Sequence, residues 1–282
     1  MNLKLKRKRL KSVAILPTLL TVGNGVCGFA SVVEASKNNF ETSAWLIFLG
    51  MFFDAMDGMA ARLTKTPSNF GAQLDSLCDV ITFGLAPAFL VYSMILPTHM
   101  RLPLGLGPTK TFWLVCAFYA VCAMLRLAKF NVETTLDTES HQSFSGLPSP
   151  AAAGMIASTV IFTADLPDYS LVKNLSLFPK SLLYVTLITA VLMISKIRYM
   201  HVTSRLLRSH YRFSNLIQLL LICLLVAMKP ELCLWTGMMI YVLIGPVMAL
   251  QYFYEIKILR KPAANPQPVT SEEPADKDVK TT

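Results

Sequence analysis

The sequence carries few charged residues for its length. Only 15% of its 282 residues are Asp, Glu, Lys or Arg, whereas an average soluble domain carries about 25%. Hydrophobic residues make up 54% of the chain, and the mean hydropathy is +0.50. This scarcity of charge excludes an ordinary soluble enzyme and predicts a polytopic membrane protein.

Histidine and cysteine are also sparse, and neither is arranged as a metal or redox site. The four histidines are isolated in the sequence, and the six cysteines include no C-x-x-C pair. The cysteines lie in or beside apolar runs, so we expect them to be small packing residues. No internal repeat relates the two halves of the chain, which argues against a repeat-built transporter.

Long apolar runs predict an all-α membrane bundle with about eight transmembrane helices. A run of about 17 to 25 apolar residues suffices to cross a bilayer. Such runs lie near residues 14–36, 42–63, 70–97, 111–130, 149–166, 180–196, 214–229 and 231–254. The first run is expected to be an uncleaved span, because no convincing cleavage site follows it.

Basic residues outnumber acidic ones by 26 to 17, which gives a formal net charge of +9. When the eight predicted spans cross the membrane one after another, most Lys and Arg residues lie on the same side of the membrane as the N-terminus. The positive-inside rule then predicts that both termini are cytoplasmic and that the protein lies in the cytoplasmic (inner) membrane. Orientation and anionic lipid head groups explain the charge, so we expect a lipid bilayer and no nucleic acid as partner.

Composition divides the chain into three parts. Residues 1–13 are predicted to be a basic juxtamembrane segment on the cytoplasmic surface. Residues 14–258 form the expected membrane domain. Residues 259–282 are rich in Pro, Asp, Glu, Lys and Thr and are expected to be a disordered cytoplasmic tail.

Four aspartates interrupt the second and third apolar runs. Asp54 and Asp57 are three residues apart, and Asp75 and Asp79 are four apart, so each pair shares one helix face. At about 1.5 Å per residue, the two pairs come level across an antiparallel hairpin near its cytoplasmic end. A carboxylate in hydrocarbon costs about 2.5 to 3.5 kcal/mol or more unless it is compensated. Two hard cations such as Mg²⁺ or Mn²⁺ would offset the four charges.

Small residues and an arginine accompany the acids. Gly58 and Ala61 remove bulk where a flat group could approach, and Arg62 offers a bidentate fork to phosphate. Taken singly, such residues are more often interfacial or helix-packing positions. Their common register with the four acids and Gly71 favours a metal site for a diphosphate-containing substrate.

The segment from Asp57 to Asp79 resembles the signature of the CDP-alcohol phosphatidyltransferases, D-G-x₂-A-R-x₈-G-x₃-D-x₃-D. The resemblance implies that an alcohol hydroxyl attacks the phosphatidyl phosphorus of a CDP-linked lipid, that CMP leaves, and that the enzyme is a homodimer. The implied metal ligands are Asp54, Asp57, Asp75 and Asp79. The implied CDP-lipid contacts are Gly58, Ala61, Arg62 and Gly71. It further implies that Asp79 is the general base, a choice among the aspartates that the residues alone leave open.

Further blocks resemble the phosphatidylserine synthase branch of that family. They are TVGNGVCG (21–28), LDSLCDVITFGLAPA (74–88), RLAKFNVE (126–133) and GLPSP (146–150). This likeness implies CDP-diacylglycerol and L-serine as substrates. Arg126 and Lys129 could bind the serine carboxylate, with Asn131 nearby for hydrogen bonding. Asn24, a polar amide inside the first span, needs a partner, and we assign it to the CDP-lipid site.

Alternatives stay open for the acceptor and for the class of protein. Glycerol 3-phosphate or inositol phosphate could replace serine, but a phosphorylated acceptor calls for a denser cationic pocket than Arg126 and Lys129 provide. A divalent-cation transporter would place carboxylates near mid-membrane and on more than one helix pair, whereas these cluster near one face. A purely structural scaffold leaves the four acids unexplained.

Overall fold

The computed structural model describes residues 3–64, 69–96, 108–136, 146–164, 177–195, 197 and 229–259, and within these residues it contains helices and no strand. The all-α prediction is therefore confirmed for this part of the chain. The elements are α1 (Leu3–Ser36), α2 (Phe40–Thr64), α3 (Asn69–Asp79), the π-helix η1 (Val80–Leu85), α4 (Ala86–Ile95), α5 (Pro108–Leu136), α6 (Ser149–Ala164), α8 (Leu177–Ile194) and α11 (Pro230–Leu259).

The described helices indicate an integral membrane protein. Five segments are long and apolar enough to cross a bilayer: Leu16–Ser36, Phe40–Ala61, Phe70–Ile95, Lys110–Val132 and Pro230–Gln251. The predicted runs 149–166 and 180–196 correspond to shorter apolar helices, and nearly all of 214–229 lies outside the described residues. The count of eight spans is thus not confirmed.

Helix α1 is longer than the membrane is thick. Its 34 residues extend for about 51 Å at the usual helical rise, against about 30 Å of hydrocarbon. The predicted basic segment therefore forms, from Leu3 onward, the first turns of the same continuous helix. The predicted tail lies outside the described residues apart from Leu259.

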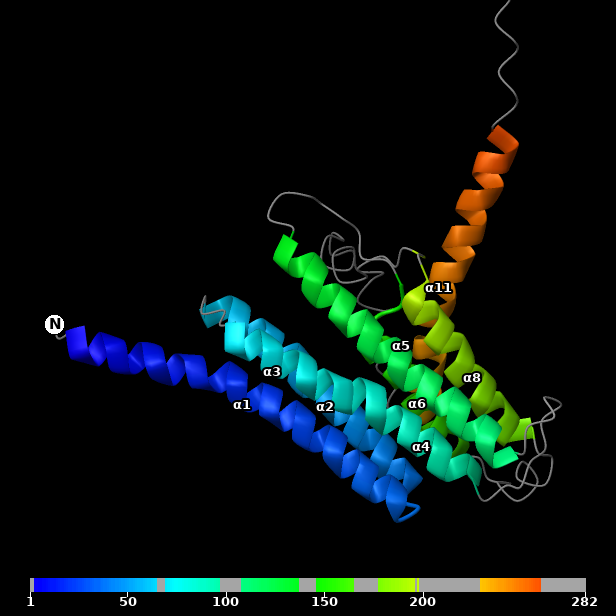
Figure 1. The fold of residues 1–282 in the computed structure, drawn as a ribbon, viewed down its shortest axis with the longest axis horizontal. Coiled ribbons are helices and arrows are strands. Elements are labelled where there is room, and N and C mark those ends of the chain that lie inside the picture. The colour runs from blue at the N-terminus through cyan, green and yellow to red at the C-terminus, as the bar shows by residue number, and fades with distance from the viewer. Residues whose placement is uncertain are drawn as a thin grey trace, which may run out of the picture.

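A tight turn makes α1 and α2 antiparallel neighbours (Figure 1). Asn38 adopts a left-handed φ of 64°, a conformation that asparagine tolerates better than most residues. The Glu34 carboxylate accepts hydrogen bonds from Lys37 Nζ at 2.8 Å and from Asn39 Nδ2 at 2.7 Å. One side chain thus holds together the turn that sets the α1–α2 hairpin.

Glycines bring α1, α2 and the third span into close contact. A Cβ added at Gly28 would collide with the backbone of Thr82, and one at Gly25 would lie 2.8 Å from the Cys78 sulfur. A Cβ at Gly50 of α2 would also meet the Thr82 side chain. Small residues permit such close helix approach in membranes, where packing drives association.

The third span changes helix type directly after Asp79. In a regular α-helix the N–H of residue 87 would bond to the Phe83 carbonyl, but Pro87 has no N–H to donate. The buried Tyr119 hydroxyl donates to this carbonyl instead, at 3.0 Å. The N–H of Ala86 bonds to the carbonyl of Ile81, five residues back, as a π-helix requires.

The third span is the central element of the bundle. In its most apolar window 61% of the residues are buried, against 11% for the span in α11. Figure 1 shows α3 and α4 running between the α1–α2 hairpin and α5. Helix α5 packs on α8, and α6 packs on α2 and α11. Helix α3, at the start of the third span, therefore packs on α1 and α5, and its acidic side chains reach those of α2.

Candidate active site

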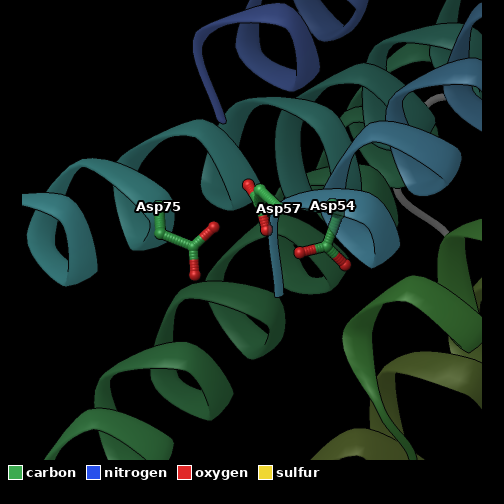
Figure 2. A group of neighbouring side chains, drawn as sticks. All are labelled: Asp54, Asp57 and Asp75. Atoms are coloured by element: carbon green, nitrogen blue, oxygen red, sulfur yellow. The ribbon is translucent and has the colours of Figure 1, made fainter. Parts of the chain in front are cut away.

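Three carboxylates converge where α2 and α3 face each other. Oxygen atoms of Asp54, Asp57 and Asp75 all lie within 4.8 Å of one another, and Figure 2 shows the three side chains pointing into a common space. Asp57 is buried, whereas the other two are partly exposed. The structure thus groups three of the four aspartates that the helical spacing predicted to lie level across the hairpin. We call them the acid cluster.

The acid cluster has the properties of a cation site. Its ligands are all carboxylate oxygens, the donor type preferred by Mg²⁺, Mn²⁺ and Ca²⁺. Oδ1 of Asp75 is buried without a hydrogen-bond partner among the described residues, which leaves a polar atom unsatisfied. A divalent cation would satisfy this oxygen and offset the repulsion between neighbouring negative charges. The residues present therefore fit a divalent metal.

Helix α1 supplies a hydrogen bond to the acid cluster. The hydroxyl of Thr21 lies 2.8 Å from Oδ2 of Asp57 and 3.0 Å from the carbonyl oxygen of Pro17. Its single proton can be donated to either oxygen, and the charged carboxylate is the stronger acceptor. Such a contact orients a ligand side chain from outside the coordination sphere.

Asp79 lies one helical turn beyond Asp75 and has different surroundings. It is not part of the acid cluster, although its charge interacts with those of all three members. Its Oδ1 accepts a hydrogen bond of 2.8 Å from Nδ2 of Asn24. Of the four predicted metal ligands, the structure thus groups three and places the fourth beside an amide of α1.

The predicted CDP-lipid residues lie around the end of α2 and the start of α3. A Cβ added at Gly58 would meet no heavy atom of the described residues within 4 Å, so these residues leave open space beside this glycine. Ala61 and Gly71 are partly buried. Arg62 belongs to α2, and its side chain lies outside the described part of the structure. A flat group could therefore approach the helix at Gly58.

The predicted serine-binding residues lie along the second half of α5. Asn131 and Ser76, the residue after an acid of the cluster, hydrogen-bond to each other at 2.8 Å and 3.1 Å. Arg126 is partly buried and interacts electrostatically with Tyr241 of α11, and Lys129 is exposed. The structure therefore brings Asn131 to the acid-bearing helix and Arg126 toward α11.

Three polar residues near the site were missed by sequence reasoning: Thr21, Ser76 and Thr82. Thr21 could have been found, because it lies three residues before Asn24 in the same span and so shares its helix face. Ser76 directly follows Asp75, but its partner Asn131 is 55 residues away. Thr82 donates to the backbone carbonyl of Asn24, and no local pattern predicts this contact.

Known proteins resemble this chain over most of its length. A CDP-diacylglycerol–serine O-phosphatidyltransferase of Bacillus subtilis is 36% identical over 187 residues, which cover 66% of this chain and 90% of the relative. An enzyme of the same name from Helicobacter pylori strain 26695 is 31% identical over 245 residues, covering 87% and 94%. An archaetidylserine synthase of Methanothermobacter thermautotrophicus is 32% identical over 196 residues, covering 68% and 72%.

The family profile of the CDP-alcohol phosphatidyltransferases matches residues 14–194. This match includes α2 and α3, which carry the acid cluster, and the whole of α5 and α6. It ends before α11, so the last described helix lies beyond the part that defines the family. The chain belongs to the CDP-alcohol phosphatidyltransferase family.

Proposed function

We propose that this chain transfers the phosphatidyl group of CDP-diacylglycerol to the hydroxyl of L-serine and releases CMP. The observation that carries the proposal is the convergence of Asp54, Asp57 and Asp75 within 4.8 Å of one another between two membrane helices. The names of the relatives support serine as the acceptor.

The reaction exchanges one phosphorus–oxygen bond for another. The hydroxyl oxygen of serine forms a bond to the phosphatidyl phosphorus, and the bond from this phosphorus to the CMP oxygen breaks. CMP leaves with the bonding electron pair, and the hydroxyl proton passes to a base. We assign the base to Asp79, whose carboxylate lies beside the acid cluster and could accept this proton.

The acid cluster would hold Mg²⁺ or Mn²⁺, and Asp79 would complete a site for two ions. Bound there, the metal supplies positive charge that offsets the negative charge of the diphosphate and of departing CMP. The chain's own contribution is to keep the three carboxylates together, with Thr21 donating a hydrogen bond to Asp57.

Residues around the cluster are proposed to bind the two substrates. The open side of Gly58 would admit the cytidine diphosphate, bordered by Ala61, Arg62 and Gly71. The serine would be bound beside α5. Its proposed contacts are Arg126, Lys129 and Asn131.

The proposed setting is the cytoplasmic membrane, with both termini and the site facing the cytoplasm. The distribution of Lys and Arg along the chain supports this orientation. A homodimer stays a prediction of the family resemblance.

The decisive assay supplies the purified full chain, in lipid nanodiscs, with CDP-diacylglycerol, Mn²⁺ or Mg²⁺ and one alcohol at a time. We expect CMP release and phosphatidylserine formation that depend on serine and on the metal, and that are lost in Asp79→Asn. CMP release with glycerol 3-phosphate or inositol phosphate alone would reassign the acceptor. No release with any alcohol, together with ion flux in liposomes, would replace the enzyme by a transporter.

A further inference from the structure

We propose that Asn24 is a positioning residue, which holds the carboxylate of Asp79 in the orientation needed to take the proton of the acceptor hydroxyl. This inference rests on the proposed function, in which Asp79 is the base. It gives Asn24 a role that differs from the CDP-lipid contact expected from the sequence.

The hydrogen bond between these residues is buried and direct. Asn24 has no exposed surface, Asp79 is 8% exposed, and Nδ2 of the amide lies 2.8 Å from Oδ1 of the carboxylate. The terminal torsion of an aspartate is otherwise broad. A donor fixed on a neighbouring helix therefore selects one orientation of the carboxylate and engages one of its two oxygens.

Asn24 is itself held in place by two neighbouring elements. The hydroxyl of Thr82, in η1, donates to the Asn24 backbone carbonyl at 2.9 Å. On the α2 side, the amide oxygen occupies space left by Gly50, where a Cβ would approach it to 3.0 Å. The amide thus reaches from α1 to both helices of the acidic hairpin. A rigid support of this kind is what a catalytic group needs for accurate placement.

The amide oxygen of Asn24 favours a catalytic role for this residue over a stabilising one. Oδ1 of Asn24 is buried and has no hydrogen-bond partner among the described residues, and an unsatisfied buried acceptor destabilises the fold. Leucine has a similar shape and would remove this unsatisfied oxygen, but it would leave Oδ1 of Asp79 without its donor. What asparagine adds over leucine is the N–H group that faces Asp79.

The burial of Asn24 also favours a positioning role over a direct contact with substrate. Asn24 presents no surface to a ligand, whereas Gly58 lies beside open space. The nitrogen that could reach a cytidine is already bonded to Asp79. A direct contact with the nucleotide would require the buried amide to become exposed.

Asn24→Leu and Asn24→Ser, assayed in nanodiscs with CDP-diacylglycerol, serine and Mn²⁺, test the proposal. Both remove the donor that reaches Asp79. We expect kcat per CDP-diacylglycerol-binding site to fall by about 100-fold, the loss typical of a misplaced catalytic group. At saturating Mn²⁺, KM for both substrates should change less than about threefold, since the positioned group acts in the chemical step.

Ser31→Ala is the matched control, because Ser31 makes a buried α1–α2 hydrogen bond to Ser43 far from the acids. It should lower thermal stability without changing kcat per binding site. Unchanged kcat in both Asn24 variants, or a rise of KM for CDP-diacylglycerol alone, would overturn the positioning role. If the wild-type protein releases CMP with another alcohol and not with serine, the same variants assayed with that alcohol still test the positioning role of Asn24.

Discussion

The hydroxyl of Thr21 in α1 lies 2.8 Å from a carboxylate oxygen of Asp57 in α2. Three residues further along α1, the amide of Asn24 reaches Asp79 in α3. One face of the first span therefore contacts an acid on each arm of the hairpin. The first helix is part of the candidate active site, although the family signature begins only at Asp57.

Thr21→Val should weaken metal binding while leaving the fold intact, because valine keeps the shape of threonine and loses the donor to Asp57. Loss of a contact that orients a metal ligand typically weakens affinity by about 10- to 100-fold. The measurement is the Mn²⁺ dependence of CMP release. Thr21→Ser, which retains the hydroxyl, should behave like wild type; an unaltered Mn²⁺ requirement in Thr21→Val would contradict the prediction.

Asp75→Asn should raise the thermal stability of the metal-free protein, because it removes one of three neighbouring negative charges. In wild type, Mn²⁺ at 100 times its Kd should add about 2.7 kcal/mol of stability, and in the variant this gain should largely vanish. Thermal unfolding in detergent with and without Mn²⁺ measures both effects.

Glu34→Gln is the matched control for this charge effect. Glu34 is an acid of the α1–α2 turn that accepts hydrogen bonds from Lys37 and Asn39. Its neutralisation should lower Tm and leave the Mn²⁺-induced rise unchanged. An equal Mn²⁺-induced rise in wild type and in Asp75→Asn would show that the metal binds elsewhere.

Gly58→Ala should impair substrate binding and spare the fold. The added methyl group enters open space, and alanine is favoured over glycine in a helix by about 1 kcal/mol. We therefore expect Tm to be unchanged or higher and KM for CDP-diacylglycerol to rise by about tenfold or more, the equivalent of about 1.4 kcal/mol. An unchanged KM would mean that the nucleotide binds elsewhere.

Gly28→Ala is the contrasting glycine variant, because its methyl group would collide with the backbone of Thr82. Overpacking of this kind typically costs about 1 to 3 kcal/mol, so this variant should have a lower Tm. Comparison of the two variants separates glycines that make room for substrate from glycines that make room for a helix.

Asn131→Leu should raise KM for serine by about five- to tenfold, the effect of losing a hydrogen bond of about 1 kcal/mol, without changing KM for CDP-diacylglycerol. Ser76→Ala removes the hydrogen bond between Ser76 and Asn131 from the other side. If both variants raise KM equally, the bond positions the acceptor site. If neither does, Asn131 has no part in serine binding.

Much of the acid cluster was predictable because its geometry is local. Residues three or four apart share a helix face, and a short connection makes consecutive helices antiparallel neighbours. These two facts place Asp54 and Asp57 opposite Asp75, as the structure has them. The same reasoning treats Asp79 as an equal member of the group, because spacing along α3 cannot tell which side chain a third helix will engage.

Helix boundaries were predictable where apolar runs are long and were less so elsewhere. The runs near 14–36 and 42–63 correspond to spans in α1 and α2, whereas 149–166 and 180–196 correspond to helices too short to qualify as spans by themselves. Hydropathy also gave no sign of the π-helix after Asp79. The π-helix ends two residues before Pro87, whose missing N–H leaves the Phe83 carbonyl to Tyr119.

The sequence by itself determined the membrane setting, the helical hairpin and the acidic signature, because hydropathy, helical period and short connections act within a few turns of the chain. The tertiary structure decided which polar groups of the first span face which acids. That choice depends on the rotation and depth of α1 against α2 and η1, which close contacts at Gly25, Gly28 and Gly50 fix. The partners Asn24 and Asp79 are 55 residues apart, and only packing brings them together.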